Sequence, residues 1–462
     1  MKHSYRLMPI AIHFIIPAIF LFAGYSLDAK SELTIKEPIS VQFTKDTSKN
    51  AFSKPIDLKS NDSIDMHILG KSFFTIPWVE APAATTARDG LGPLFSANTC
   101  IHCHQKNGAG IATDKNAKIT RSLVMHLSIP HGSDDLKMKN GFIPEPTYGA
   151  QLSVNGTSNT PFESSVNLTY KKIIGKYADG STYELQNPTY KLSNLQYGPL
   201  HKDINIAPRI GLALIGLGAL ESIDEKEILK NEDIEDKDGN GISGKANWVY
   251  NPETNSTELG RFSWKGSAAT IVQQTANAAH NDMGLSNPLF PSHNCTDAQK
   301  ECKKESEGKH KFDLPQNRLN AIAYYLKTLK IPKERITQNY SKGKELFNKL
   351  NCVKCHTQKF KIANGQIIKP YSDLLLHDMG DALSDGHTMY KATAKEFRTP
   401  PLWGIGLYKK VSGNISLLHD GRARSVAEAI LWHGGEAKET RELFKKLSKK
   451  DRDYLIEFVN SI

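Results

Sequence analysis

The chain has 462 residues, of which 8% are aromatic and 23% are charged. This length allows two or three domains with hydrophobic cores, and the composition is that of a globular protein. The formal net charge of +10 can attract acidic partner proteins. No segment has the pattern of a nucleic-acid-binding module, so we expect no nucleic-acid partner.

Residues 1–29 are predicted to be a signal peptide or an N-terminal anchor. Lys2 and Arg6 precede an apolar run over residues 7–27, which is the pattern of a secretory signal. No other stretch is long and apolar enough to span a bilayer. We therefore expect export to the periplasm, with membrane attachment only through an uncleaved N-terminus.

Residues 30–84 are polar and rich in Lys and Ser, and we expect them to form an extended lead segment. Beyond it, the pentapeptides at residues 100–104 and 352–356 both read C-x-x-C-H, the attachment pattern of a c-type haem. In this chemistry two thiols bond covalently to the haem, and the histidine ligates the iron. The predicted residues for two covalent haems are Cys100, Cys103, His104, Cys352, Cys355 and His356.

The sequence around each pentapeptide favours haem over the other uses of C-x-x-C, a structural zinc site or a redox site. Both copies carry the histidine, and Phe95 and Phe347 each lie five residues before the first cysteine of their copy. We expect a short amphipathic helix to run into each haem site.

Residues 141–199 contain many Gly, Pro, Asn, Thr and Tyr in short alternating runs. This pattern is typical of strands and loops. We expect them to be inserted into an otherwise helical first domain.

A short acidic segment has the beginning of a calcium-binding loop. Asp236, Asp238 and Asn240 fit the pattern D-x-D-x-N-G, and Ser243 can add an oxygen ligand. Asn247 stands where an EF-hand has a bidentate Glu, so the segment is not a complete EF-hand. Calcium binding and a plain turn rich in Asp and Asn remain open as alternatives.

Two cysteines are not used by the haem motifs. Cys295 and Cys302 lie seven residues apart in one polar segment. In an oxidising compartment they are predicted to form a local disulfide; two free thiols are the alternative.

The order of haem motif, apolar turn with Gly, and capped helix occurs twice. Residues 208–218 resemble residues 398–407, and residues 264–274 resemble residues 419–429. In the second pair, a Gly and a small residue precede a Ser or Thr that can cap a helix. The repetition indicates two related haem regions.

Apolar residues at helical spacing predict two further helices, over residues 315–330 and 451–459. Combined with the repeats, they lead us to predict a mainly α fold with two cytochrome-c-like haem domains. The first domain, residues 85–335, carries the β- and loop-rich insertion, and the second domain covers residues 336–462.

The sixth ligand of each iron decides between an electron carrier and an enzyme. Met is a common partner of His in electron-transfer haems, and the tripeptide Asp-Met-Gly occurs around both Met283 and Met379. We expect Met379 to ligate the second iron. The alternatives are His377, Met389, or a Met that only packs in the core. Met283 can ligate the first iron.

Other polar and aromatic residues of the repeats are candidates for contact with the haems. Trp264 and Trp403 sit at corresponding turns, where an indole can relay electrons between haems; each can equally be a large core residue. His419 and Arg422 can bond haem propionates, since Arg suits carboxylates, or they can tie the domains together.

Taken together, five segments resemble the di-haem oxidoreductase family of peroxidase-like proteins, sometimes labelled thiol oxidoreductases. The segments are residues 238–244, 260–265, 370–380, 398–406 and 418–437. The family is similar to bacterial di-haem cytochrome c peroxidases and to the enzymes that mature methylamine dehydrogenase. The resemblance implies that one haem handles peroxide and the other passes electrons. The thiol label has little support, because haem uses the C-x-x-C cysteines.

The resemblance also implies catalytic residues beside the first haem. In the peroxidase relatives, a helix bearing Gln, followed by an acidic residue, handles peroxide. Gln273, Gln274 and Asp282 fall in the comparable stretch, with Asp as a shorter arm than the usual Glu. A carboxylate can take a proton from peroxide and return it to the leaving oxygen. His126 and His131 are further candidates.

The leading hypothesis is a periplasmic di-haem oxidoreductase that reduces peroxide or a related small oxidant. Its electrons would come from a donor protein such as a small cytochrome or a cupredoxin. The alternatives are a pure di-haem electron-transfer protein and a haem enzyme that oxidises a protein partner. A high-spin haem in the half-reduced protein distinguishes the first hypothesis from the second.

Overall fold

The computed structural model describes Met1, residues 40–305 and residues 308–462. From residue 40 onward, these residues belong to one compact unit, residues 35–462. The predicted signal or anchor lies outside the described residues, apart from Met1. None of the helices described for the chain is both long and apolar enough to cross a bilayer. The division into two haem domains stays a prediction.

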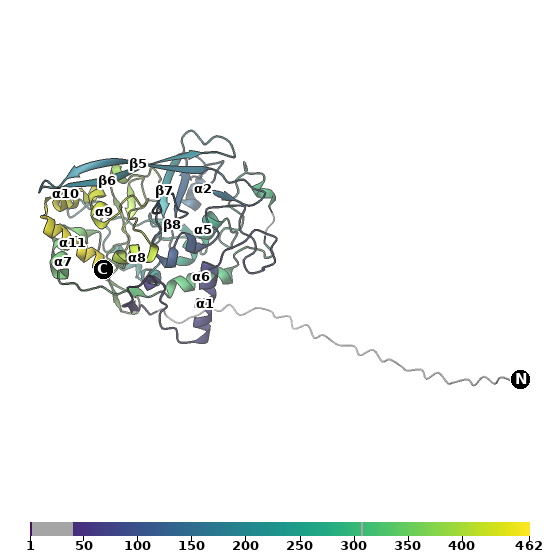
Figure 1. Cartoon of the computed structure of the whole chain (residues 1–462), viewed down its shortest axis with the longest axis horizontal. Coiled ribbons are helices and arrows are strands. Elements are labelled where there is room, and N and C mark those ends of the chain that lie inside the picture. Colours follow the sequence, from purple (N-terminus) through teal and green to yellow (C-terminus); the bar gives the residue numbers. More distant parts are fainter. Residues whose placement is uncertain (2–39, 306–307) are drawn as a thin grey trace. The chain divides into compact units, whose positions relative to one another are not determined.

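Eleven α-helices are present in the described residues (Figure 1). They are α1 (Asn61–Thr75), α2 (Asp134–Asn140), α3 (Leu217–Glu221), α4 (Glu225–Leu229), α5 (Ile271–Met283), α6 (Gln316–Lys327), α7 (Tyr340–Lys349), α8 (Tyr408–Ser412), α9 (Val426–Trp432), α10 (Lys438–Lys446) and α11 (Lys449–Ser461).

The strands of the described residues pair two by two, in seven separate sheets. The pairs are β1 (Phe43–Thr44) with β10 (Ile331–Pro332), β2 (Leu94–Phe95) with β4 (Asn155–Gly156), β3 (Leu123–Ser128) with β7 (Asn205–Ile210), β5 (Ser165–Lys176) with β6 (Thr182–Ser193), β8 (Trp248–Asn251) with β9 (Ser256–Leu259), β11 (Phe360–Lys361) with β12 (Ile367–Ile368), and β13 (Leu376–Asp378) with β14 (Glu396–Arg398). Only β1 and β10 are parallel.

The prediction of a mainly α fold built from cytochrome-c-like domains is therefore wrong. Small sheets are spread over the chain well beyond the predicted insertion, and several helices are only five to seven residues long. The physical reason is that strands such as β3 and β7 pair across long stretches of chain, and such pairing is not visible in local sequence periodicity. The helices pack among these strand pairs.

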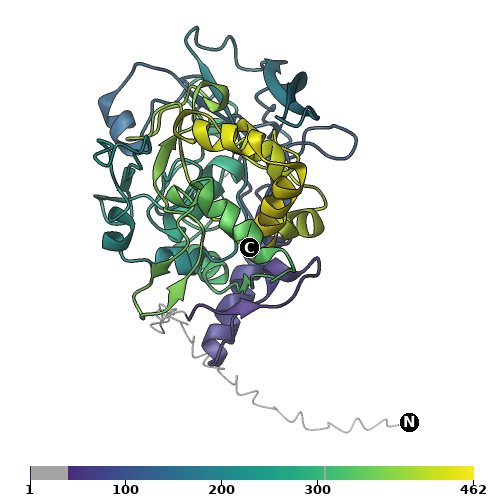
Figure 2. The same ribbon diagram turned by 90° about the vertical axis from the view of Figure 1, so that its left-hand side faces the viewer.

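Helix α1 occupies part of the stretch that the sequence predicts to be extended, residues 30–84. Phe73 and Phe74 of α1 are buried in the core, and α1 lies against α6 (Figure 1; Figure 2). A Cβ atom at Gly70 would lie 1.9 Å from the Ala321 carbonyl oxygen, so glycine allows the two helices to touch. Burial of this aromatic pair against α6 stabilises α1, although the polar composition of the segment gives no sign of a helix.

The insertion contains a long antiparallel hairpin, β5–β6, as its alternating sequence predicts. The tip of this hairpin reaches the C-terminal helices, where the Ala178 N–H donates to the Lys445 carbonyl at 3.0 Å. Arg452 of α11 stacks 3.7 Å from the centre of the Tyr177 ring and pairs with Asp179 at 2.8 Å. The hairpin therefore ties the insertion to α10 and α11, which it overlies in Figure 1.

The two lead-ins to the C-x-x-C-H motifs differ in structure. A helix, α7, runs into the second motif as predicted. The helix predicted before the first motif is wrong, because Phe95 lies in β2 and pairs with Asn155 of the insertion. Pro93 directly before this strand has no N–H to donate, and the insertion offers a partner strand that the second region lacks.

The capped helices of the repeat are confirmed. The Thr270 hydroxyl accepts the backbone N–H of Gln273 at the start of α5, and the Ser425 hydroxyl accepts that of Glu428 at the start of α9. Helices α6 and α11 confirm the two helices predicted from apolar spacing. Buried residues of α5, α6, α7 and α11 belong to one hydrophobic core, so both motifs are attached to the same core.

Candidate functional site

Each C-x-x-C-H motif opens onto a large cavity. The first cavity is lined by Cys100, Cys103 and His104 and contains about 1820 Å³ of space not filled by protein atoms, including its opening to solvent. The second cavity is lined by the corresponding residues of the second motif, and the same measure is about 1550 Å³. Each cavity thus lies directly beside two cysteines and a histidine, the groups that attach a c-type haem.

His104 is oriented toward the first cavity by its surroundings. Its Nδ1 is buried without a hydrogen-bond partner among the described residues. A Cβ atom at Gly211 would lie 2.4 Å from the His104 ring, so the glycine makes room for the imidazole. Burial lowers the pKa of His104 to about 4, which leaves the ring neutral, as an iron ligand must be.

His356 has the tautomer that suits iron ligation. Its Nδ1 donates to the Tyr371 carbonyl at 2.8 Å, so Nε2 is free to bind a metal from the second cavity. Burial lowers the pKa of this histidine to about 4. The hydrogen bond fixes the ring orientation before any metal binds.

The cysteines of the two motifs do not have the environment of a zinc or redox site. Burial raises the pKa of the Cys100 and Cys352 thiols to about 12, so neither has the environment of an activated redox cysteine. All four motif cysteines are free. In the part of the chain that the structure describes, three metal-ligand atoms meet only at Asp233, Asp236 and Asp238. The motif residues thus fit covalent haem better than zinc.

Met379, the predicted sixth ligand, lines the second cavity together with the motif residues. His433 lines the same cavity and was missed at the sequence level. Its Nδ1 donates to the Ala429 carbonyl at 2.6 Å, which leaves Nε2 free. The signal for His433 is its position just after α9, in a segment that the family resemblance already covers.

The two alternatives to Met379 are not placed to ligate the second iron. Both nitrogens of His377 are occupied, by Asp373 at 2.8 Å and by Glu436 at 2.7 Å. Burial lowers the pKa of His377, but Asp373 and Cys355 raise it well above its usual value. Met389 lines the first cavity.

The first cavity brings together only part of the predicted catalytic set. Gln274, Asp282 and Met283 line it. Gln273 does not, because its amide accepts the Ala269 N–H and donates to the Tyr250 carbonyl, both at 2.8 Å. The two neighbouring glutamines therefore have different roles, and the side chain of Gln273 holds the start of α5.

Asp282 is the carboxyl group of the first cavity. Gln151 Nε2 donates to its Oδ1 at 2.7 Å. Burial raises the pKa of Asp282 to about 6, and the hydrogen bond from Gln151 opposes this rise. A carboxyl group of this kind can hold or release a proton near neutral pH.

A pair of histidines adds to the first cavity. His126 lines it, as does His387, which the sequence did not single out. The two rings are 5.9 Å apart, and His387 is held by a 2.8 Å hydrogen bond between Nδ1 and the Ser128 hydroxyl. His387 Nε2 is buried without a partner among the described residues. His131 is exposed and lines neither cavity.

The two predicted tryptophans lie at different places. Trp264 lines both cavities, and its indole donates to the Ile210 carbonyl at 2.7 Å. Trp403 lines only the first cavity, although it belongs to the second repeat. Trp264 is therefore the tryptophan placed at the boundary between the cavities.

His419 and Arg422, both predicted to bond haem propionates, lie in different surroundings. His419 lines the second cavity and stacks on Phe397 with ring centres 4.4 Å apart. Arg422 lines neither cavity. Its guanidinium pairs with Asp420 at 2.8 Å and lies over the Trp432 ring, so it is used within the protein.

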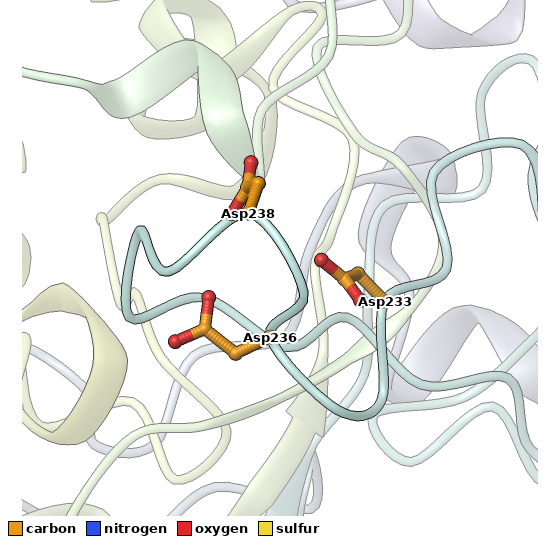
Figure 3. A group of neighbouring side chains, drawn as sticks. All are labelled: Asp233, Asp236 and Asp238. Carbon is orange, nitrogen blue, oxygen red and sulfur yellow. The ribbon is translucent and has the colours of Figure 1, made fainter.

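The acidic loop gathers three carboxylates, Asp233, Asp236 and Asp238, whose ligand atoms lie within 4.8 Å of one another (Figure 3). Asp233 was not in the predicted set; its position just before the D-x-D motif is the only signal for it. Asn240 instead donates to Asp238. At the end of the loop, Ser243 donates to Glu436, the partner of His377. Calcium at this loop stays a prediction.

Cys295 and Cys302 are bonded as a disulfide, with Cα atoms 5.7 Å apart. The bond closes a short loop beyond α5. It lies apart from the motif cysteines, which line the two cavities.

Comparison with known proteins supports the haem interpretation. Residues 34–462 match the model of a family described as "Di-haem oxidoreductase, putative peroxidase". No protein with a curated description matches the sequence. A solved structure of Kuenenia stuttgartiensis hydrazine synthase, pressurized with xenon, has 12% sequence identity and a TM-score of 0.35, with 98% of this chain and 100% of that chain covered. That likeness is too low to support an inference. On the family match, the chain belongs to the di-haem oxidoreductase family.

Proposed function

We propose that the chain carries two covalent c-type haems and acts as a peroxidase-type oxidoreductase of the periplasm. The first haem would be held by Cys100, Cys103 and His104, and the second by the corresponding residues of the other motif. Haem, when bound, supplies reversible one-electron chemistry. Electrons would come from a donor protein such as a small cytochrome or a cupredoxin, and the oxidant would be peroxide or a similarly small molecule.

The observation that carries this proposal is the difference between two cavities that share a wall. The first cavity presents Gln274, Asp282 and His126, which are groups that can bind and protonate a small oxidant. The second cavity presents Met379, and none of the described carboxylates lines it, which suits an iron that only exchanges electrons. Trp264 lies at the common wall.

The residues of the first cavity have separate tasks in this proposal. Asp282 takes a proton from the peroxide oxygen that stays behind and returns it to the oxygen that leaves. Gln151 donates to Asp282 and keeps its carboxylate in place. Gln274 and His126 orient the oxidant through hydrogen bonds.

A specific observation favours a second candidate, a pure electron-transfer protein. Met283 is buried and lines the first cavity directly beside Asp282. If Met283 stays bound to the first iron in every redox state, no open position is left for an oxidant. The two candidates therefore differ in the coordination of the first haem.

Spectra of the half-reduced holoprotein, recorded with and without hydrogen peroxide, test the proposal. A high-spin signal from one haem that disappears on addition of peroxide is expected. Two low-spin haems with no response to peroxide would contradict the peroxidase proposal and support the electron-transfer candidate.

A further inference from the structure

One buried arginine differs from the others in having no carboxylate partner. The buried arginines among the described residues are Arg209, Arg398, Arg422 and Arg452. Three of them are paired with aspartates: Arg209 with Asp385, Arg422 with Asp420, and Arg452 with Asp179. Within residues 40–305 and 308–462, no carboxylate lies within ion-pair distance of Arg398, which is only 2% exposed.

Arg398 ends β14 at the boundary between the two cavities, both of which it lines. Its backbone N–H donates to the Trp264 carbonyl at 2.8 Å. The guanidinium Nε donates to the Ser263 carbonyl at 2.8 Å, and Nη1 donates to the Thr399 carbonyl at 3.0 Å. An arginine has five N–H donors, so most of the donors of the Arg398 guanidinium have no acceptor in the described structure.

A buried cation is strongly unfavourable unless an anion lies close to it. Asp373 favours the charged form of Arg398, but it lies beyond ion-pair distance and is bonded to His377 at 2.8 Å. The carbonyl groups of Ser263 and Thr399 satisfy hydrogen bonds but carry no charge. A carboxylate that enters the cavities would give Arg398 a close charge partner. Haem carries propionate carboxylates, and the planar guanidinium matches carboxylates particularly well.

We propose that Arg398 binds propionates of both haems and so couples the two cavities electrostatically. The inference rests on the two covalent haems of the proposed function. It gives Arg398 the role that the sequence suggested for Arg422, whose fork is already used by Asp420. A cation beside both groups disfavours the oxidised iron, which carries one more positive charge, and thus raises both reduction potentials.

The test is a redox titration of the holoprotein that follows each haem by its own spectral signature. Haem content is measured first, as the pyridine haemochromogen. In Arg398→Gln, both midpoint potentials are expected to shift to more negative values, and Arg398→Lys should restore most of that shift. Arg209→Gln, at a residue that lines only the first cavity, should shift the first haem alone. Arg452→Gln, at a buried arginine that lines neither cavity, should shift neither haem.

Unchanged potentials in Arg398→Gln, with both haems present, would overturn the inference, and so would a shift of one haem only. If the unaltered protein contained no covalent haem, the proposed function itself would be contradicted. Diffraction from the unaltered holoprotein keeps the inference testable if Arg398→Gln does not fold. Propionate oxygens of both haems about 2.7–2.9 Å from the Arg398 nitrogens support it; water or an inorganic anion in their place would overturn it.

Discussion

The first and second cavities are each lined by one C-x-x-C-H motif and share a wall at Trp264, yet their remaining walls differ. Asp282, Gln274 and His126 face the first cavity. Met379 and His433 face the second, among apolar side chains of α9 and α11. If each motif attaches a haem as we propose, the shared motif determines where that haem is bound, and the surrounding walls determine what its free face can do.

The strongest way to separate the cavities is to remove one haem at a time. Replacing Cys100 and Cys103 by Ala should abolish covalent haem in the first cavity and, with it, the reaction with peroxide. Replacing Cys352 and Cys355 should remove the other haem and leave a first haem that reacts without being re-reduced. Haem content and stopped-flow spectra measure both effects. Cys295→Ser is the control and should keep both haems, since the disulfide lies apart from the cavities.

The acid–base asymmetry can be tested with Asp282→Asn. An amide cannot take a proton from peroxide, so the rate constant for the reaction with peroxide should fall by roughly 10²–10⁴-fold. The spectrum of the second haem should not change. Asp297→Asn, at a side chain that is 97% exposed, is the matched control. An unchanged rate in Asp282→Asn would show that the polar lining of the first cavity is not used in catalysis.

The ligand of the second iron can be identified with two single variants. We expect Met379→Ala to alter the ligand-field bands of the second haem only, with the first haem unaffected. Met389→Ala, at a residue that lines the first cavity, controls for loss of a methionine. If Met379→Ala is silent and His433→Ala changes the bands instead, His433 is the ligand and the Met379 assignment is wrong.

The smallest expected effect concerns the acidic loop. If calcium binds the three aspartates of Figure 3, it should stabilise the fold by about 2.7 kcal/mol at a concentration of 100 Kd, and Asp236→Asn should remove this gain. Calorimetric titration and thermal unfolding measure it. Because Ser243 contacts Glu436, which holds His377, chelation should perturb the second haem more than the first. Equal perturbation of both haems would contradict the proposed link between the acidic loop and the second haem.

Local sequence was a reliable guide wherever a feature depends on neighbouring residues. The helix caps at Thr270 and Ser425, helices α6 and α11, and the hairpin of the insertion follow from short patterns. The helix expected before Cys100 failed for a non-local reason, because a strand of the insertion pairs with Phe95. The fold class failed for a similar reason: strand pairs such as β3–β7 join segments far apart in the chain.

Within the candidate site, the failures concern side-chain direction. Gln273 and Gln274 are adjacent, but one bonds to backbone groups and the other lines a cavity. Successive helical residues point about 100° apart, so the family resemblance alone does not separate them. His377 is a candidate ligand from the sequence, but Asp373 and Glu436 occupy both its nitrogens in the structure.

The sequence by itself determined the two attachment motifs, because covalent haem binding needs two thiols and a histidine within five consecutive residues. Tertiary structure alone decided how the cavities differ. Trp403 and His387 come from the second half of the chain and line the first cavity, and Arg398 lines both. A cavity wall is assembled from distant segments that share one hydrophobic core, and their positions depend on the packing of that core as a whole.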